Sequence, residues 1–179
     1  MRTLLGIFVS VVTLTAAGEL SNRRAPGFSL PDMVSMQQHD PQDYRGRILL
    51  VEVMQTTCPH CLKFSGILEE VVTKYAGRVA VLSITNPPDN MATVRQFAAQ
   101  HKITVPILYD CGQVAASYLK VGPSNPTVNI PHLFVIDAQG MIRADFSYGP
   151  LTKEIFEGQG LFAELDRMMT PSRTLPPKR

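Results

Sequence analysis

Two cysteines separated by two residues are the part of this sequence best suited to chemistry. They belong to the segment Cys58-Pro59-His60-Cys61, which follows an apolar run and opens a helical pattern. A helix N-terminus offers unpaired N–H groups and a partial positive charge, so a sulfur placed there is stabilised as the reactive thiolate. The second thiol, one helical turn on, can displace a mixed disulfide formed by the first. The spacing therefore predicts dithiol–disulfide exchange through Cys58 and Cys61.

Other uses of the C-x-x-C spacing are less well supported. A zinc site needs a second pair of ligands, and the only other cysteine, Cys111, is not part of such a pair. Haem attachment requires a histidine directly after the second cysteine, where this chain has Leu62. A structural disulfide over so short a span would stabilise little. Metal-binding and structural interpretations remain open as minor alternatives.

The two residues between the cysteines are expected to tune the site. Pro59 suits the first helical turn, where its missing N–H costs nothing. His60 places a titratable ring beside the sulfur, and a cationic ring would stabilise the Cys58 thiolate and make the disulfide more oxidising. The alternative is an exposed turn histidine without such an effect. We favour the electrostatic role.

The elements that must position these residues follow from the apolar pattern. A buried strand is predicted over residues 48–54 and a helix from about 59 to 75, with a plausible cap at Gly77. Further elements are expected as strands at 79–84 and 105–109, helices at 91–101 and 114–119, a hairpin of 133–137 with 141–148, and a helix at 153–169. This order predicts an α/β, thioredoxin-like fold, whose central mixed sheet is flanked by helices. It adds an N-terminal extension and an inserted βα segment between 91 and 119.

Composition limits the class of protein. The chain has 179 residues, 45% of them hydrophobic and 18% charged, which suits one globular domain with flanking tails. The net charge of +2 comes from the flanks, because residues 25–170 hold more acidic than basic side chains. With no clustered basic patch and no tryptophan, we expect no nucleic-acid partner. Three cysteines are too few for a disulfide-scaffold protein.

The two ends of the chain are expected to lie outside the domain at 25–169. Residues 1–20 combine Arg2, a short apolar stretch and small residues at 15–17, which predicts a signal peptide or N-terminal anchor. An amphipathic or buried N-terminal helix is the alternative. Export would place the protein in the periplasm or another extracytoplasmic space, possible membrane contact being limited to that anchor. Residues 21–26 are interpreted as a linker and 170–179 as a flexible basic tail.

Three sequence features together resemble a known family. They are the C-P-H-C segment after residues 49–53, Ile130-Pro131 before residues 133–137, and the A-P-G-F-S-L opening at 25–30. Over about residues 25–165 the chain resembles the TlpA/ResA-like thiol–disulfide oxidoreductases of the thioredoxin superfamily. The Pro-His dipeptide is similar to that of the DsbA-type oxidases. The resemblance implies an enzyme without a cofactor, with protein thiol or disulfide substrates and a redox partner protein.

The resemblance also implies roles for individual residues. Cys58 would be the exposed attacking thiol and Cys61 the buried resolving thiol. Pro131 matches the family's cis-proline, which packs against the C-x-x-C segment and leaves the Ile130 backbone free to pair with a substrate chain. The alternative is an ordinary trans proline that opens a strand.

Glu52 is the candidate proton acceptor. It lies six residues before Cys58, and an acid at this position also occurs in thioredoxin and in DsbA-type proteins. Buried beneath the site and facing Cys61, such a carboxyl would have a raised pKa and could accept the Cys61 proton. The alternative is a strand glutamate that faces solvent or pairs with a base.

Two other functions and one unassigned cysteine complete the sequence-based interpretation. A peroxiredoxin-type peroxidase would have a threonine three residues before the reactive cysteine, where this chain has Gln55. A copper-binding module would need a separate histidine near the thiols, and His132 is the sequence candidate, although a surface position is equally plausible. Cys111 could be a buried apolar filler, which is commonest, an intermolecular thiol or a resolving thiol.

Overall fold

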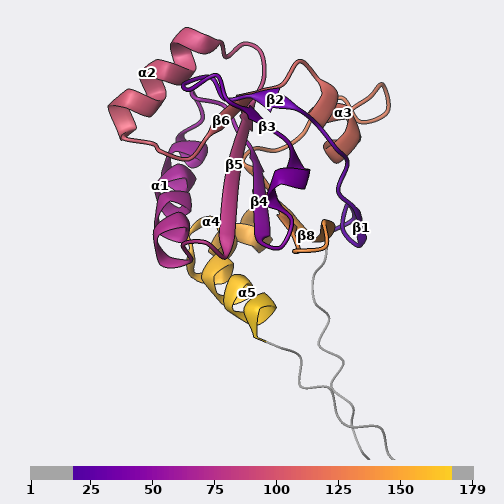
Figure 1. Cartoon of the computed structure of the whole chain (residues 1–179). Coiled ribbons are helices and arrows are strands. Elements are labelled where there is room, and N and C mark those ends of the chain that lie inside the picture. The colour runs from indigo at the N-terminus through magenta and orange to yellow at the C-terminus, as the bar shows by residue number, and fades with distance from the viewer. Residues whose placement is uncertain (1–17, 171–179) are drawn as a thin grey trace, which may run out of the picture.

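The computed structural model describes residues 18–170 (Figure 1). The predicted targeting segment falls almost wholly outside these residues, as does the predicted basic tail apart from Thr170. Within residues 18–170, no helix is both long and apolar enough to cross a membrane.

A mixed six-stranded sheet forms the centre of the fold, in the order β1-β8-β7-β4-β5-β6. Its strands are β1 (Arg23–Arg24), β4 (Ile48–Val53), β5 (Val79–Thr85), β6 (Ile107–Tyr109), β7 (His132–Ile136) and β8 (Met141–Ser147). β4, β5 and β6 are parallel, whereas β7 runs antiparallel to both β4 and β8. A separate two-stranded sheet joins β2 (Leu30–Pro31) to β3 (Gln38–His39). The C-terminal end of β4 therefore lies beside the start of β7, at the same end of the sheet.

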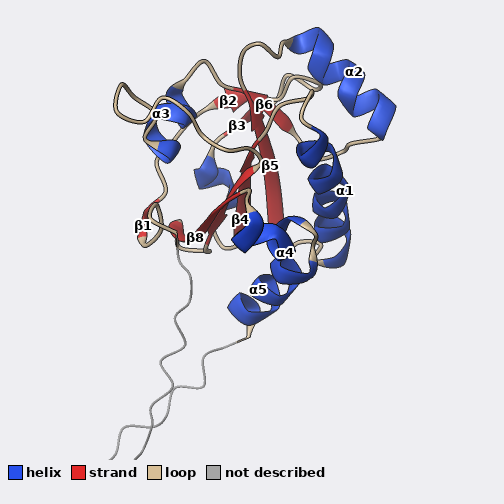
Figure 2. Ribbon diagram, turned by 180° about the vertical axis from the view of Figure 1, so that it is seen from behind, coloured by secondary structure: helices blue, strands red, loops and turns tan. Residues whose placement is uncertain are grey.

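Helices cover both faces of the sheet (Figure 2). They are α1 (Pro59–Lys74), α2 (Met91–His101), α3 (Gln113–Leu119), α4 (Lys153–Phe156) and α5 (Gln159–Met169), with 3₁₀ turns η1 (Pro41–Tyr44) and η2 (Pro150–Thr152). Buried side chains of α1, α4 and α5 pack on one face, and those of α3 with the N-terminal segment pack on the other. The expected thioredoxin-like fold is confirmed.

The central strand β4 shows why the apolar run at 48–54 lies inside. All six residues of β4 are buried. Leu50 belongs to the core under α1 and α5, whereas Leu49 and Val51 belong to the core on the opposite face. This alternation is the two-residue period of a strand, and apolar side chains on both sides mark a strand covered by helices on both faces.

The predicted helix at 153–169 is in fact two helices. Gly158 has φ of +96° and separates α4 from α5. This left-handed region strongly favours glycine, so the residue turns the chain between the two helices. The Gly77 cap is also displaced: Tyr75 is the C-cap of α1, and Gly77 adopts φ of +76° two residues beyond it.

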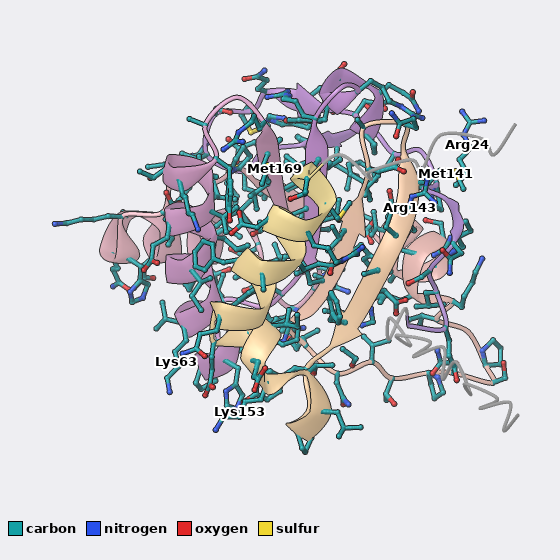
Figure 3. All side chains as sticks on the ribbon, turned by 90° about the horizontal axis from the view of Figure 1, so that it is seen from below. Arg24, Lys63, Met141, Arg143, Lys153 and Met169 are labelled. Atoms are coloured by element: carbon teal, nitrogen blue, oxygen red, sulfur yellow. The ribbon has the colours of Figure 1, made fainter. Side chains whose placement is uncertain are left out.

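The predicted linker at 21–26 contains a strand. Arg23 and Arg24 form β1, which pairs with Ile142 and Met141 of β8 (Figure 3 labels Arg24 and Met141). The Arg23 guanidinium also donates to the backbone carbonyl of Tyr118 at 2.7 Å. The linker prediction is wrong here, because these polar residues are held by backbone pairing at the sheet edge, which leaves no apolar pattern in the sequence.

Candidate active site

Cys58 is the N-cap of α1. Its backbone is extended (φ −85°, ψ 116°), and its sulfur accepts a hydrogen bond from the backbone N–H of Cys61 at 3.2 Å. Pro59 occupies the first helical turn, as predicted. The sulfur thus receives an N–H group at the positive end of the helix, a position that favours a negatively charged acceptor.

Cys61 is fully buried, whereas Cys58 is half-buried, and both are free thiols in this structure. Burial raises the pKa of the Cys61 thiol, and its hydrogen bond with Cys58 and the nearby Glu52 carboxyl act in the same direction. The two sulfurs therefore differ in the way that separate attacking and resolving roles require. Cys61 needs a proton acceptor before it can act as a nucleophile.

Glu52 lies on β4 and has no exposed surface. Ser83 Oγ donates a hydrogen bond of 2.7 Å to Glu52 Oε2, and Glu52 Oε1 has no hydrogen-bond partner among residues 18–170. Burial raises the pKa of Glu52 to about 8, against the opposing effect of the Ser83 hydrogen bond. A carboxyl with this pKa can both hold and accept a proton near neutral pH, and the predicted burial of Glu52 is confirmed.

The loop that precedes Cys58 is anchored by a buried carboxylate that sequence reasoning missed. Asp89 accepts hydrogen bonds from the Thr56 backbone N–H (2.9 Å) and hydroxyl, the Thr85 hydroxyl (2.5 Å) and the Thr93 hydroxyl (3.1 Å). Burial acts to raise the pKa of Asp89, but these hydrogen bonds outweigh it and hold the pKa below its ordinary value. Asn90, rather than Asp89, is the N-cap of α2.

Ile130, the residue before Pro131, lies beside Cys58. The Ile130–Pro131 peptide bond is cis, as the resemblance implied, and Pro131 is buried directly before β7. The Cys58 sulfur lies 4.0 Å from the Ile130 carbonyl oxygen. The antiparallel pairing of β7 with β4 brings these distant parts of the chain together.

His60 lies on the exposed side of the site and stacks on Tyr148. The two ring centroids are 4.2 Å apart and the rings are inclined by 25°. The Tyr148 backbone N–H donates to the Pro131 carbonyl at 3.0 Å. Tyr148 was not identified from the sequence, because an aromatic residue at a strand end gives no signal of its own.

His132 is buried rather than exposed. Its Nε2 lies 3.6 Å from Asp145 Oδ2, and its ring stacks on Phe134. Asp145 also accepts hydrogen bonds from the Leu20 backbone N–H (3.1 Å) and the Ser21 hydroxyl (2.7 Å). Asp145 thereby links the N-terminal segment to the sheet. The sequence-based suggestion of a surface position for His132 is wrong.

Cys111 is exposed, so its interpretation as a buried filler is wrong. It follows the buried Asp110, whose carboxylate accepts the backbone N–H groups of Val114 and Ala115 at the start of α3. Over residues 18–170 no cluster of three or more His, Cys, Asp or Glu side chains is placed to hold a metal ion.

The sheet order and the site together define a class of protein. A mixed sheet whose central strand leads to a thiol at the N-terminus of α1, with a cis-proline opposite that thiol, is a thioredoxin-like fold with a dithiol centre. The chain belongs to the AhpC/TSA family, whose sequence profile matches residues 22–145.

Individual relatives agree with this assignment. The chain is 28% identical over 142 residues to the thioredoxin-like protein YneN of Bacillus subtilis, covering 78% of each chain. It is 25% identical over 136 residues to the thiol-disulfide oxidoreductase ResA of Bacillus thuringiensis, covering 76% of this chain and 74% of ResA. The expected kinship with ResA-like proteins and the enzyme class of thiol–disulfide oxidoreductase are thereby confirmed.

A solved structure shares the fold. The solution structure of a thiol:disulfide interchange protein from Bacteroides sp. superimposes with a TM-score of 0.67 at 13% identity. The match covers 86% of this chain and 93% of that one.

Proposed function

We propose that the protein exchanges thiols and disulfides on protein substrates through the Cys58–Cys61 pair. The observation that carries this proposal is the contrast between the two sulfurs. Cys58 Sγ accepts the Cys61 N–H at the N-terminus of α1, while the Cys61 side chain is fully buried with a raised pKa. One sulfur is thus available to a substrate and the other only to its neighbour.

In the oxidised enzyme, a substrate thiolate attacks Cys58 Sγ. The Cys58–Cys61 bond breaks, a substrate–Cys58 disulfide forms, and Cys61 leaves as a thiolate that takes a proton. A second substrate thiolate then attacks the substrate sulfur of this mixed disulfide and releases the Cys58 thiolate. The substrate loses two electrons and the enzyme gains them. The reverse sequence reduces a substrate disulfide, and a redox partner protein resets the enzyme in either direction.

Glu52 is the proposed proton carrier for Cys61. In the reductive direction, Cys61 must lose its proton before it attacks the mixed disulfide at Cys58. Burial leaves Glu52 with a pKa of about 8, and one of its carboxyl oxygens has no partner within the described part of the chain. That oxygen can take the proton directly or through an intervening water.

The Ile130 backbone is the proposed docking edge for substrates. Its carbonyl lies 4.0 Å from Cys58 Sγ, and over residues 18–170 its N–H makes no backbone hydrogen bond. An extended substrate segment could pair with this backbone while presenting its own sulfur to Cys58. Main-chain pairing tolerates many side chains, so it suits an enzyme with several protein substrates.

The chain ends belong to the same proposal. We propose an exported protein with a signal peptide or anchor at 1–20, a thioredoxin-like domain at 25–169 and a basic tail at 170–179. The composition of residues 1–20 supports export, which would place the thiols where disulfide chemistry is normal. Fractionation of cells that express the full chain tests this, and recovery of uncleaved protein in the cytosol would contradict it.

Two alternative functions have specific observations against them. Gln55 stands where a peroxidase would have its threonine. His132, the candidate copper ligand, is buried and already faces Asp145 at 3.6 Å. Peroxide consumption by the reduced protein, or tight copper binding that Cys58→Ser abolishes, would favour one of these alternatives.

Trapping of the mixed disulfide tests the main proposal. Cys61→Ser should accumulate a covalent complex with a protein substrate that carries a disulfide, because the Cys58 thiolate attacks that disulfide and one substrate sulfur leaves as a thiolate. Cys58→Ser should form none. Equilibration with glutathione gives the redox potential, which indicates whether the enzyme serves as an oxidant or a reductant. Complexes formed equally by both variants would contradict the assigned roles.

A further inference from the structure

The ring of Tyr148 is the one aromatic surface that stacks on His60 within residues 18–170. We propose that Tyr148 is a positioning residue that holds the His60 ring at the N-terminus of α1 and, through His60, raises the redox potential of the Cys58–Cys61 pair. This inference rests on the thiol–disulfide exchange proposed above and adds a residue that governs its direction.

Tyr148 is itself fixed from several sides. Its backbone N–H donates to the Pro131 carbonyl at 3.0 Å. Its ring packs edge-on against Phe156, at a centroid distance of 5.5 Å, and Phe156 packs in the same way against Phe64 at 4.8 Å. Phe64 and Phe156 are both fully or nearly fully buried. A ring braced in this way gives the exposed His60 a preferred orientation that its own helix does not impose.

The stack also affects the charge of His60. The face of an aromatic ring attracts a cation, so the Tyr148 ring offers a cation–π contact to an imidazolium at His60. An imidazolium next to Cys58 stabilises the thiolate of the reduced enzyme, and the disulfide has no such charge to stabilise. Anything that favours the dithiol form relative to the disulfide makes the pair more oxidising.

No acidic side chain takes the place of the Tyr148 ring as the partner of His60. On α1, Lys63 follows one turn later, and on α4, which packs against α1, the charged residues are Lys153 and Glu154. Lys153 pairs with Glu157 at 3.3 Å. No carboxylate of the described chain forms an ion pair with His60. Among the residues described, the Tyr148 ring is therefore the group that contacts the His60 ring directly.

A double-mutant cycle tests the proposal. The parent, Tyr148→Leu, His60→Ala and the double variant are each equilibrated with reduced and oxidised glutathione, and the dithiol and disulfide forms are quantified. We expect Tyr148→Leu to lower the equilibrium constant for disulfide reduction about threefold, a change of about 14 mV. In the His60→Ala background the same substitution should have no further effect. Tyr148→Phe, which keeps the ring face, should preserve the coupling.

The controls separate positioning from packing. Phe162→Leu removes a partly buried ring from α5 that contacts Tyr75 rather than the site, and it should leave the potential unchanged. Thermal unfolding confirms that each variant is folded, and Tyr148→Met replaces Tyr148→Leu if the latter is not. An equal shift in both His60 backgrounds, or no shift, would overturn the proposal. Failure of the parent to exchange with glutathione would instead overturn the proposed function.

Discussion

Glu52 and Ser83 face one another across the parallel strands β4 and β5, and the Ser83 hydroxyl donates to the Glu52 carboxyl at 2.7 Å. Both side chains are buried, and this single hydrogen bond does not offset the loss of water around the carboxyl. Glu52 consequently holds a proton at pH values where an exposed glutamate is charged.

The stability of the protein should therefore fall as the pH rises. The pKa of Glu52 increases from an ordinary 4.5 to about 8 on folding. The stabilisation of the protonated form is thus complete below pH 4.5 and is lost as the pH rises to 8. Glu52→Gln should remove this slope, with a relative gain of roughly 3 kcal/mol between pH 4.5 and 7. Urea unfolding across this range measures it. The exposed Glu70→Gln serves as control, and parallel curves for Glu52→Gln and parent would contradict the prediction.

The same substitution should affect one chemical step. Glutamine cannot take the Cys61 proton, so Glu52→Gln should slow resolution of the mixed disulfide by about tenfold or more, while its formation at Cys58 changes little. Stopped-flow mixing with a fluorescent disulfide substrate separates the two steps. If both rates match those of the parent, Glu52 has only a structural role.

Alkylation should distinguish the two thiols. Cys58 is half-buried at the helix N-terminus, whereas Cys61 is fully buried with a raised pKa. Iodoacetamide added to the reduced protein between pH 5 and 8 should label Cys58 at least tenfold faster than Cys61. Peptide mass spectrometry after short exposures measures the ratio, and exposed Cys111 provides an internal standard. Preferential labelling of Cys61 would reverse the assigned roles.

Loss of the Asp89 carboxylate should loosen the loop before Cys58. Asp89→Ala removes the acceptor for the Thr56 backbone N–H and for the hydroxyls of Thr85 and Thr93. We expect a loss of about 2–3 kcal/mol in the free energy of unfolding, since buried donors are left unpaired. Hydrogen exchange at the Thr56 amide should accelerate more than exchange in α5. Unchanged protection of Thr56 would show that the loop is held by other contacts.

Acid should release the N-terminal segment from the sheet. Burial acts to raise the pKa of Asp145, but the His132 ring at 3.6 Å and hydrogen bonds from the Ser21 hydroxyl and the Leu20 backbone outweigh it and hold the pKa below its ordinary value. For a carboxyl with a lowered pKa, the stabilisation is present above its unfolded pKa of about 3.9 and is lost as the pH falls through the lower folded value. Asp145→Asn should flatten the acid limb of the stability curve. An identical acid limb in the variant would contradict this.

The sequence predicted the elements that carry a strong periodic signal. The apolar run of β4 and the start of α1 at Pro59 placed Cys58 correctly, because these features depend on local pattern and local chemistry. The resemblance, rather than periodicity, placed Pro131 opposite the thiols. The division between α4 and α5 was missed because a glycine within a helical pattern does not by itself reveal a positive φ at Gly158.

Contacts made across the sheet could not be predicted in the same way. His132 meets Asp145 diagonally across β7 and β8, and the register of these strands shifts between Val135 and Ile136. The stack of His60 on Tyr148 depends equally on where β8 ends relative to α1. Such pairs are fixed by strand register and crossing geometry, which no single segment encodes.

The proton on Glu52 also changes how the molecule should migrate in an electric field. The formal net charge of +2 counts all fifteen acidic side chains as ionised. With a pKa of about 8, however, the buried Glu52 is mostly protonated and neutral at pH 6. At pH 6 the folded protein thus carries one positive charge more than its composition indicates, histidines aside. On a native gel at that pH, Glu52→Gln should comigrate with the parent, whereas Glu70→Gln should move by a full unit of charge. The mobility of the folded protein on a native gel thus reports the protonation state of the buried Glu52 carboxyl.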